Sequence, residues 1–260
     1  MLLKDRNTII YGAAGSIGSA VARTFAREGA TVHLCGRTRE PLQQLAAEIA
    51  AAGGNAEVAV IDALDEQAVE QHARAVAAAH GSVDVSFNLV TRGDVQGIAL
   101  VDMTAEDLLR PVATGLQSTF NTARAAARIM AEQGSGVILS MTSGSARGSA
   151  PMMGGTGPAD AATETFLRHL AAEMGSRGVR VAGIYAAGVA GTLTVEKVDK
   201  VNANAPELEQ IDAMLKSLTM LKRRTELDDV AQTAAFLASD RAAGITATTV
   251  NVTSGMVPGP

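Results

Sequence analysis

Three glycines near the start of the chain, Gly12, Gly15 and Gly18, have the spacing of a phosphate-binding turn. An apolar strand signal at residues 8–10 precedes them, and a helical pattern of apolar residues begins at Ile17. Glycine permits a tight turn and a close backbone approach, and the following helix offers unpaired N–H groups and a positive dipole end. The spacing therefore predicts a site for the pyrophosphate of a dinucleotide.

Two further residues bear on how such a ligand is held. Ser16, inside the turn, can donate its hydroxyl and N–H groups to a phosphate, or it can cap the helix, and the two roles are compatible. An acid about 20 positions past the turn favours NAD, whereas an arginine accommodates the 2′-phosphate of NADP. Residues 34–39 hold no carboxylate but include Arg37, whose planar fork of donors suits a phosphate. We predict NADP(H); the alternative is a solvated loop arginine.

Strand and helix signals alternate along the rest of the chain. Residues 104–133 are expected to be helical but broken or bent near Pro111 and Gly115. Repeated strand–helix units predict an α/β fold, a parallel sheet with right-handed crossovers and helices on both faces. No repeat or linker is visible, so residues 1–260 are interpreted as a single domain. Strands are expected at residues 8–10, 31–35, 57–61, 83–87, 136–141, 179–184 and 246–252, and further helices at residues 41–52, 65–79, 158–174 and 228–238.

Composition excludes several classes of protein. With 260 residues, 47% hydrophobic and 19% charged, the chain can bury one globular core. A net charge of −5 argues against nucleic acid or an anionic membrane surface as partner. The single cysteine, Cys35, cannot form an internal disulfide, and we find neither a signal peptide nor a membrane-spanning stretch. We expect a cytoplasmic protein, and no metal, because His and acidic residues lack metal-ligand spacing.

Several segments besides the glycine turn share one pattern. Residues 60–65 contain Asp62, residues 136–143 end on Ser143, and residues 177–181 and 221–255 complete the set. Together these segments resemble the short-chain dehydrogenase/reductase family over nearly the whole chain. The resemblance implies a Rossmann-type, doubly wound, three-layer αβα fold and oxidoreductase activity. It also implies that Asp62 contacts adenine and that Ser143 is the active-site serine.

The catalytic positions depart from that family. Its tyrosine is expected 13 residues after Ser143, where Thr156 stands, and its lysine four residues later, where Asp160 stands. Gly115 occupies the position of its helical asparagine, and no lysine occurs between Lys4 and Lys197. A nearby cation can tune a phenol into a proton donor near neutrality, but a threonine hydroxyl titrates far too high.

A carboxylate at position 160 has two expected effects. Asp160 can accept hydrogen bonds from ribose hydroxyls, so cofactor binding can survive the exchange. It also favours the positively charged oxidised nicotinamide over the neutral reduced one, which favours reduction of the substrate.

Other groups are candidates for the missing chemistry, each with an ordinary alternative. Tyr185, near the nicotinamide by family analogy, is a displaced proton donor or packs against the core or a partner subunit. Ser143 polarises a carbonyl or satisfies backbone at a strand end. Arg92 and Arg147 bind an anionic substrate or are solvated loop residues. The candidate cofactor contacts are completed by Ile17, Asn88 and Thr192.

Two segments bear on substrate access and assembly. Residues 192–221 occupy the place of the family's mobile lid, with a permanently packed helical pair as the alternative. Residues 154–157 contain three glycines and are expected to be conformationally loose. The family commonly assembles through the Ala-rich helix at residues 122–130 and the helix that begins near Pro158. We therefore expect a homo-oligomer, a dimer or a tetramer.

These observations favour one function and leave two others open. The first is an NADP(H)-dependent oxidoreductase with a non-standard site that reduces a small ketone or conjugated carbonyl. The second is a catalytically silent NADP(H)-binding partner or sensor. The third is non-redox chemistry on the same fold, since fold does not fix function.

Overall fold

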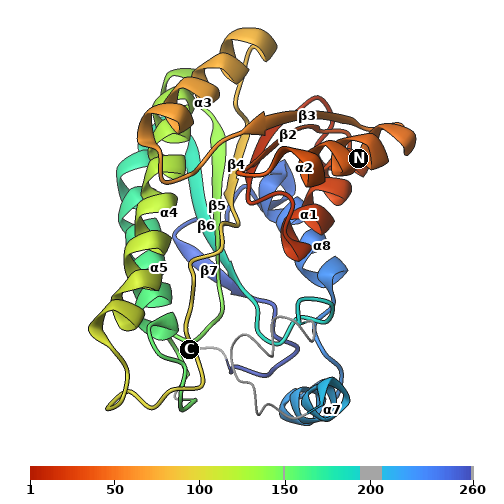
Figure 1. The fold of residues 1–260 in the computed structure, drawn as a ribbon. Helices are drawn as coiled ribbons and strands as arrows, with labels where there is room; N and C mark the ends of the chain where they lie inside the picture. Colours follow the sequence, from red (N-terminus) through yellow and green to blue (C-terminus); the bar gives the residue numbers. More distant parts are fainter. Residues whose placement is uncertain (149, 194–206, 259–260) are drawn as a thin grey trace.

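Seven strands form one parallel sheet in the order β3-β2-β1-β4-β5-β6-β7 in the computed structural model of the protein (Figure 1). The structure describes residues 1–148, 150–193 and 207–258. The order reverses between β1 and β4, and such a switch point leaves a crevice outside the carboxyl ends of the strands. The strands are β1 (Asn7–Tyr11), β2 (Thr31–Gly36), β3 (Asn55–Val60), β4 (Val85–Asn88), β5 (Gly136–Thr142), β6 (Val179–Tyr185) and β7 (Thr248–Asn251).

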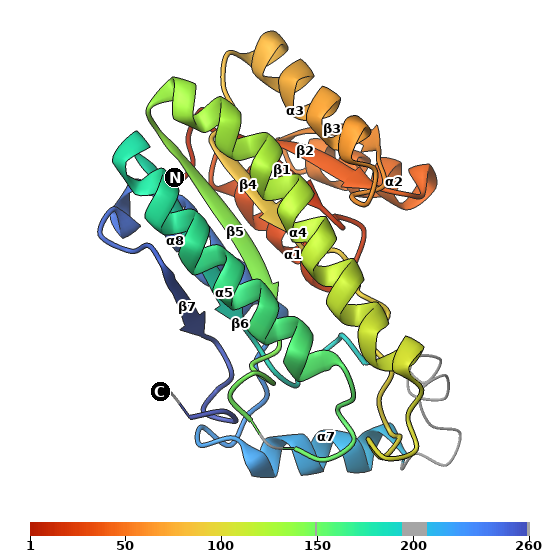
Figure 2. The same cartoon turned by 90° about the vertical axis from the view of Figure 1, so that its left-hand side faces the viewer.

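Helices cover both faces of the sheet, which confirms the predicted three-layer αβα arrangement (Figures 1 and 2). One face carries α1 (Ser16–Arg27), α2 (Arg39–Ala51) and α8 (Leu227–Ala238). The other carries α3 (Glu66–His80), α4 (Ala105–Gln133) and α5 (Thr156–Met174). Short 3₁₀ helices at Gly175–Arg177 and Asp240–Ala242 follow α5 and α8. Each face has its own apolar cluster, and the sheet lies between the two as the middle layer.

The central strands are buried along their whole length. Every residue of β1 and of β4 is buried. Within β1, Ile10 packs with α1 and α8, whereas Ile9 packs in the cluster on the α3 and α4 side. Strands covered on both faces lack an alternating polar pattern. This burial explains the short, continuous apolar runs from which the strands were predicted.

Helix α4 is continuous over 29 residues, so the break considered near Pro111 and Gly115 is not present. Pro111 lies in the second turn, where a missing N–H removes one hydrogen bond near the helix start and leaves the longer part intact. Gly115 has a packing reason instead. A Cβ built on it would lie 2.6 Å from Cδ of Arg92, so the glycine makes room for that side chain.

Part of the predicted lid, residues 192–221, is a helix beyond the carboxyl ends of the strands, α7 (Leu208–Leu218), set apart from the two helical layers (Figures 1 and 2). Arg224 holds it there, donating to Asp212 on α7 at 3.0 Å and to the carbonyl of Gly188 at 2.7 Å. Residues 194–206 of the predicted lid lie outside the described residues, so the lid stays a prediction.

No helix in the described ranges is long and apolar enough to cross a membrane.

Candidate active site

The glycine turn connects β1 to α1 and has no room for a side chain at Gly12 or Gly18. Gly12 has φ +77°, and a Cβ there would lie 2.5 Å from the carbonyl oxygen of Leu89. A Cβ on Gly18 would collide with the carbonyl of Gly12. Gly15 is the N-cap of α1 and Ser16 its first residue, so the N-cap role considered for Ser16 is wrong. The turn therefore presents bare backbone and a helix N-terminus to whatever lies above it.

Two adjoining cavities of about 300 and 220 Å³ follow the carboxyl edge of the sheet and share Gly15, Val90 and Thr91. All nine predicted cofactor-binding residues line one or the other. Their positions agree with one elongated ligand crossing the switch point of the sheet. The first cavity is lined by Gly15, Ser16, Ile17, Gly18, Asn88 and Thr192, and the second by Gly12, Gly15, Arg37 and Asp62.

The second cavity contains the residues expected at an adenosine end. Arg37 is exposed, and no ion pair or hydrogen bond joins it to another residue in the described part of the chain. The Asp62 carboxylate accepts the N–H of Leu64 at 3.0 Å, which fixes the loop after β3. Cys35 also lines this cavity, and burial raises the pKa of its thiol, so the thiol is inert near neutrality.

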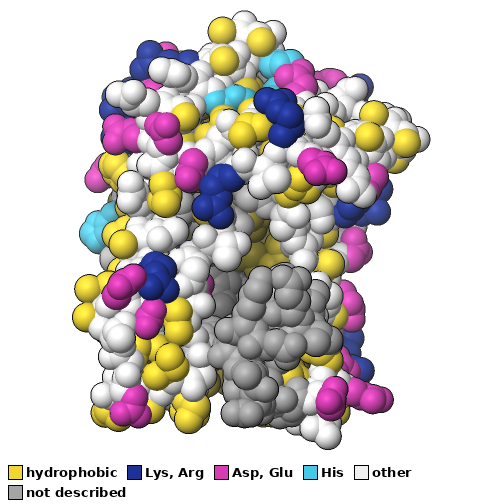
Figure 3. Space-filling view, in the orientation of Figure 1, with side chains coloured by type: hydrophobic (Ala, Val, Ile, Leu, Met, Phe, Trp, Pro, Cys, Tyr) yellow, Lys and Arg dark blue, Asp and Glu magenta, His cyan; other side chains and the backbone are white. Residues whose placement is uncertain are grey.

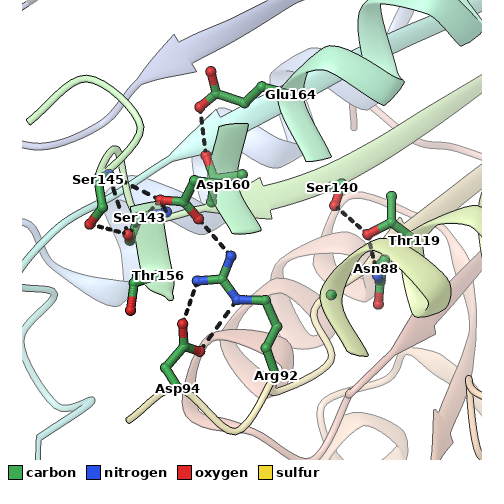
Figure 4. A network of polar contacts seen from close by, with 12 residues as sticks. Asn88, Arg92, Asp94, Thr119, Ser140, Ser143, Ser145, Thr156, Asp160 and Glu164 are labelled. Atoms are coloured by element: carbon green, nitrogen blue, oxygen red, sulfur yellow. Dashed lines mark hydrogen bonds and ion pairs between the residues drawn. The ribbon is translucent and has the colours of Figure 1, made fainter. Parts of the chain in front are cut away.

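Asn88, at the end of β4, is buried and bonded within the protein. Its amide nitrogen donates to Thr119 at 2.9 Å and to Ser118 at 3.2 Å, both on α4 (Figure 4). Its amide oxygen accepts the N–H of Val90 at 3.1 Å. These bonds hold the segment after β4, which separates the two cavities, against α4.

Asp160, on α5, is fully buried and accepts hydrogen bonds at both carboxylate oxygens (Figure 4). One oxygen accepts from the Arg92 guanidinium at 2.6 Å. The other accepts from the Ser143 hydroxyl at 2.7 Å, the Ser143 N–H at 3.1 Å and the Ser145 N–H at 3.0 Å. Its charge is therefore paired inside the protein. The structure does not bring Asp160 to the cavity wall, where the sequence placed it beside ribose and nicotinamide.

Arg92 supplies a cation to the site from the segment after β4. Its side chain is 14% exposed and lines the first cavity beside Gly115. It also donates to both carboxylate oxygens of Asp94, at 3.1 and 3.3 Å. Within the described ranges these bonds use three of the five guanidinium N–H groups. Two N–H groups remain for a ligand oxygen.

The residues around Ser143 that replace the family's catalytic groups are tightly packed. The Ser143 oxygen lies 2.8 Å from the Ser145 hydroxyl, and its own proton goes to Asp160. Thr156 is buried, accepts from the Gln96 amide at 3.2 Å and is not among the residues that line the two cavities. Gly155 is closely packed, since a Cβ there would collide with the carbonyl of Leu108, and the looseness expected for residues 154–157 stays a prediction.

Tyr185 lies away from both cavities as far as the described residues define them, with 1% of its surface exposed. The Arg147 guanidinium stacks 4.8 Å from the centre of its ring. Burial raises the pKa of the Tyr185 phenol, which makes it a poorer proton donor. Arg147 pairs with Glu164 at 2.9 Å, and Thr142 donates to the same carboxylate at 3.1 Å. The Arg147 guanidinium is therefore already bound to a protein carboxylate.

Sequence reasoning missed the partners of the two buried acids on α5. Asp160 and Glu164 lie one turn apart, and each pairs with an arginine from a loop, Arg92 and Arg147. Asp94 was missed as well. Charge balance was the available signal. A buried acid needs a cation as its partner, and since this region has no lysine, only the arginines of the nearby loops can supply it.

Known proteins resemble the chain along most of its length. A family model described as enoyl-(acyl carrier protein) reductase matches residues 12–257. L-rhamnose 1-dehydrogenase (NAD(P)(+)) of Azotobacter vinelandii is 34% identical over an alignment of 261 positions that covers 98% of each chain. A solved 7α-hydroxysteroid dehydrogenase complexed with NADH and 7-oxo glycochenodeoxycholic acid is similar with a TM-score of 0.85 and 26% identity, covering 97% of this chain and 94% of that one. A short-chain type dehydrogenase/reductase from Mycobacterium ulcerans is similar with a TM-score of 0.87 and 27% identity, covering 99% and 91%.

Proposed function

The chain belongs to the short-chain dehydrogenase/reductase family, and from this membership we propose that it is an NADP(H)-dependent oxidoreductase that reduces a ketone or conjugated carbonyl. The observation that carries the proposal is the Arg92 guanidinium, held at the wall of the first cavity by the buried carboxylate of Asp160. The family's tyrosine and lysine are replaced by Thr156 and Asp160, and the cation at the first cavity is Arg92, from the segment after β4.

The chain's own residues fit the cofactor. The turn at Gly12 and Gly18 leaves no space for a Cβ, as a backbone cradle for a pyrophosphate requires. Arg37, exposed at the far end of the second cavity, suits a 2′-phosphate. Ser16 and Ile17, at the start of α1, face the first cavity and bring the helix N-terminus to the phosphates. NADPH, when bound there, supplies the hydride.

Arg92 stabilises the charge that reduction creates. Hydride addition places negative charge on the carbonyl oxygen or, in a conjugated carbonyl, on an enolate oxygen. Charge-assisted donors fixed in advance at that position lower the barrier, and orientation of the reactants lowers it further. Arginine acts as a donor and a charge rather than as a proton source, so water protonates the product. Asp160 is a positioning residue that fixes Arg92 and Ser143.

Hydride transfer tests the function directly. NADPH carrying deuterium at nicotinamide C4 is incubated with the protein and a panel of small ketones and conjugated carbonyls. We expect deuterium on the carbonyl carbon or on the β-carbon of one class of product, measured by mass spectrometry. Separate incubations with each C4 isotopomer cover both faces of the cofactor. Absence of transfer from either isotopomer to every compound would remove the oxidoreductase assignment.

One observation favours a second candidate, a catalytically silent NADP(H)-binding partner or sensor. Asp160 takes up the Ser143 hydroxyl proton and one N–H of Arg92, and Thr156 accepts a hydrogen bond from Gln96. This candidate predicts micromolar or tighter cofactor binding by calorimetry together with no deuterium transfer.

Replacement of Arg37 by alanine should change the choice between the two cofactors. Loss of one charge-assisted contact costs about 1.5–3 kcal/mol, or roughly 10- to 100-fold in NADPH affinity. The affinity for NADH, which has no 2′-phosphate, should stay the same. The matched control is Arg39→Ala, an exposed arginine on α2 that does not line the described cavity. Calorimetry with both cofactors measures the ratio, and an unchanged ratio in Arg37→Ala would reject NADP(H).

We also propose a homo-oligomer, a dimer or a tetramer, formed through α4 and α5. These helices present exposed Leu109 and Phe120 around an apolar surface hollow that Phe166 completes. A contiguous apolar patch of this kind is typical of an interface. Velocity sedimentation at micromolar protein concentration should show dimers or tetramers. A sample that contains only monomer would reject the proposal.

A further inference from the structure

Three of the four histidines of the chain gather beside one edge of the sheet, outside both cavities. His33 lies on β2, and His72 and His80 lie on α3. Glu57, on the edge strand β3, completes the group. Histidine and acidic side chains lie together in this region, over α3 and β3 at the top of the molecule (Figure 3). The proposed oxidoreductase chemistry uses none of the four.

The backbone explains why these side chains meet. Strands β2 and β3 pair in parallel with His33 directly aligned with Glu57, so both side chains point to the same face of the sheet. Helix α3 packs on that face and ends at His80. A residue from each of three elements therefore converges at the sheet edge.

The nitrogen and oxygen atoms of His33, Glu57 and His80 lie close together, but some of them have no hydrogen-bond partner. Nε2 of His80 lies 3.3 Å from one Glu57 oxygen, and Nδ1 of His33 lies 3.6 Å from the other. One ligand atom from each of the three residues lies within 4.8 Å of the others. The His33 side chain is 1% exposed, yet neither of its ring nitrogens has a hydrogen-bond partner in the described ranges. Buried polar atoms normally have partners, so this orphaned imidazole points to a missing ligand.

The protonation state suits a metal. Burial lowers the pKa of His33 to about 4, and the neighbouring His80 and His72 add to this effect while Glu57 opposes it. Burial also lowers the pKa of His72. A neutral imidazole offers its lone pair to a cation near neutrality without first losing a proton.

We propose that His33, Glu57 and His80 bind one divalent transition metal ion, with Zn²⁺ the best match. Two imidazoles and a carboxylate, with water in the fourth position, form a common zinc ligand set. Ligand atoms around tetrahedral zinc lie about 3.4 Å apart, so the group must contract. Glu57 is 57% and His80 26% exposed, which leaves both side chains room to move.

The absence of metal-ligand spacing in the sequence is no obstacle to this site. Positions 33, 57 and 80 come from two strands and a helix, so only the fold brings them together. The ion would tie the edge strand β3 to β2 and to the end of α3. It would therefore have a structural role, remote from hydride transfer.

The test uses full-length, tag-free protein that has been treated with a chelator and then titrated with Zn²⁺ at pH 7.5. Competition with a chromophoric indicator should show one tight site per chain, and Zn²⁺ should raise the melting temperature. Loss of an exposed ligand in His80→Asn or Glu57→Gln should weaken binding roughly 10- to 100-fold or more. Both variants leave the buried His33 in place, so failure to fold does not obscure the result.

The matched control is His169→Asn, the one histidine outside the group. It should bind Zn²⁺ like the parent protein. Absence of a one-to-one site, or equal affinity in His80→Asn and His169→Asn, would overturn the proposal.

Discussion

Asp160→Ala should lower the free energy of unfolding by about 3–5 kcal/mol, the usual cost of removing one partner from a buried ion pair. The change leaves Arg92 with Asp94 as its one carboxylate partner in the described ranges, and it leaves the N–H groups of Ser143 and Ser145 without their acceptor. Domains are stable by about 5–15 kcal/mol, so this variant would approach unfolding near room temperature. Urea unfolding at fixed protein concentration measures the shift in midpoint.

The chain offers a matched surface pair as the control. Glu106 also pairs with an arginine, Arg110, at 2.9 Å, but its side chain is 82% exposed. Glu106→Ala should cost less than about 1 kcal/mol, because water and salt screen exposed pairs. Asp160→Asn, which keeps the shape and one acceptor oxygen, should fall between the two. Equal losses in Asp160→Ala and Glu106→Ala would show that the buried carboxylate is not the anchor of the site.

Arg92→Met should reduce turnover about 10²- to 10³-fold, the usual effect of removing one donor that stabilises an oxyanion. The KM for NADPH should change little, because the glycine turn and Arg37 are untouched. Arg92→Lys keeps the charge but loses the planar fork that Asp160 and Asp94 hold, so its turnover should be intermediate. Steady-state rates are compared after circular dichroism has shown that each variant is folded.

Arg147→Met separates chemistry from packing. Arg147 makes the same kind of buried pair one turn along α5, with Glu164 at 2.9 Å, yet it does not line the described cavities. Its loss should lower stability while turnover stays within about twofold of the parent, since no donor to the reacting oxygen is removed. If the two variants slow turnover equally, Arg92 has no special place beside the reacting atoms.

Most of the fold could be predicted because its signals are local. The run at residues 8–10 became the centre of β1 (Asn7–Tyr11). The helix expected from residue 65 begins at Glu66, with the Asp65 carboxylate accepting the N–H groups of Gln67 and Ala68. The break considered in α4 is absent, and the reason for the glycine at position 115 is non-local. Gly115 accommodates Arg92, 23 positions earlier in the chain, and no pattern within the helix reveals that contact.

The candidate site also has one part that local sequence signals predict and one part that they do not. The glycine turn, Arg37 and Asp62 follow strand ends, and parallel strands bring their carboxyl ends to one edge, so the structure gathers them as expected. The Arg92–Asp160 pair joins residues 68 positions apart. The residue types alone could not show whether a carboxylate in the lysine position faces the cofactor or an internal cation.

The contact between Gly115 and Arg92 limits how this protein can evolve or be re-engineered. A Cβ at position 115 would lie 2.6 Å from Arg92 Cδ, so any side chain there displaces the arginine. A displaced arginine would have to adjust its contact with the carboxylate of Asp160, and a lysine at 160 would meet the arginine as a like charge. The three positions are therefore coupled. A substitution at one of them changes which residues the other two accept. Restoring the family's tyrosine and lysine would therefore require libraries that vary positions 92, 115, 156 and 160 together rather than one at a time.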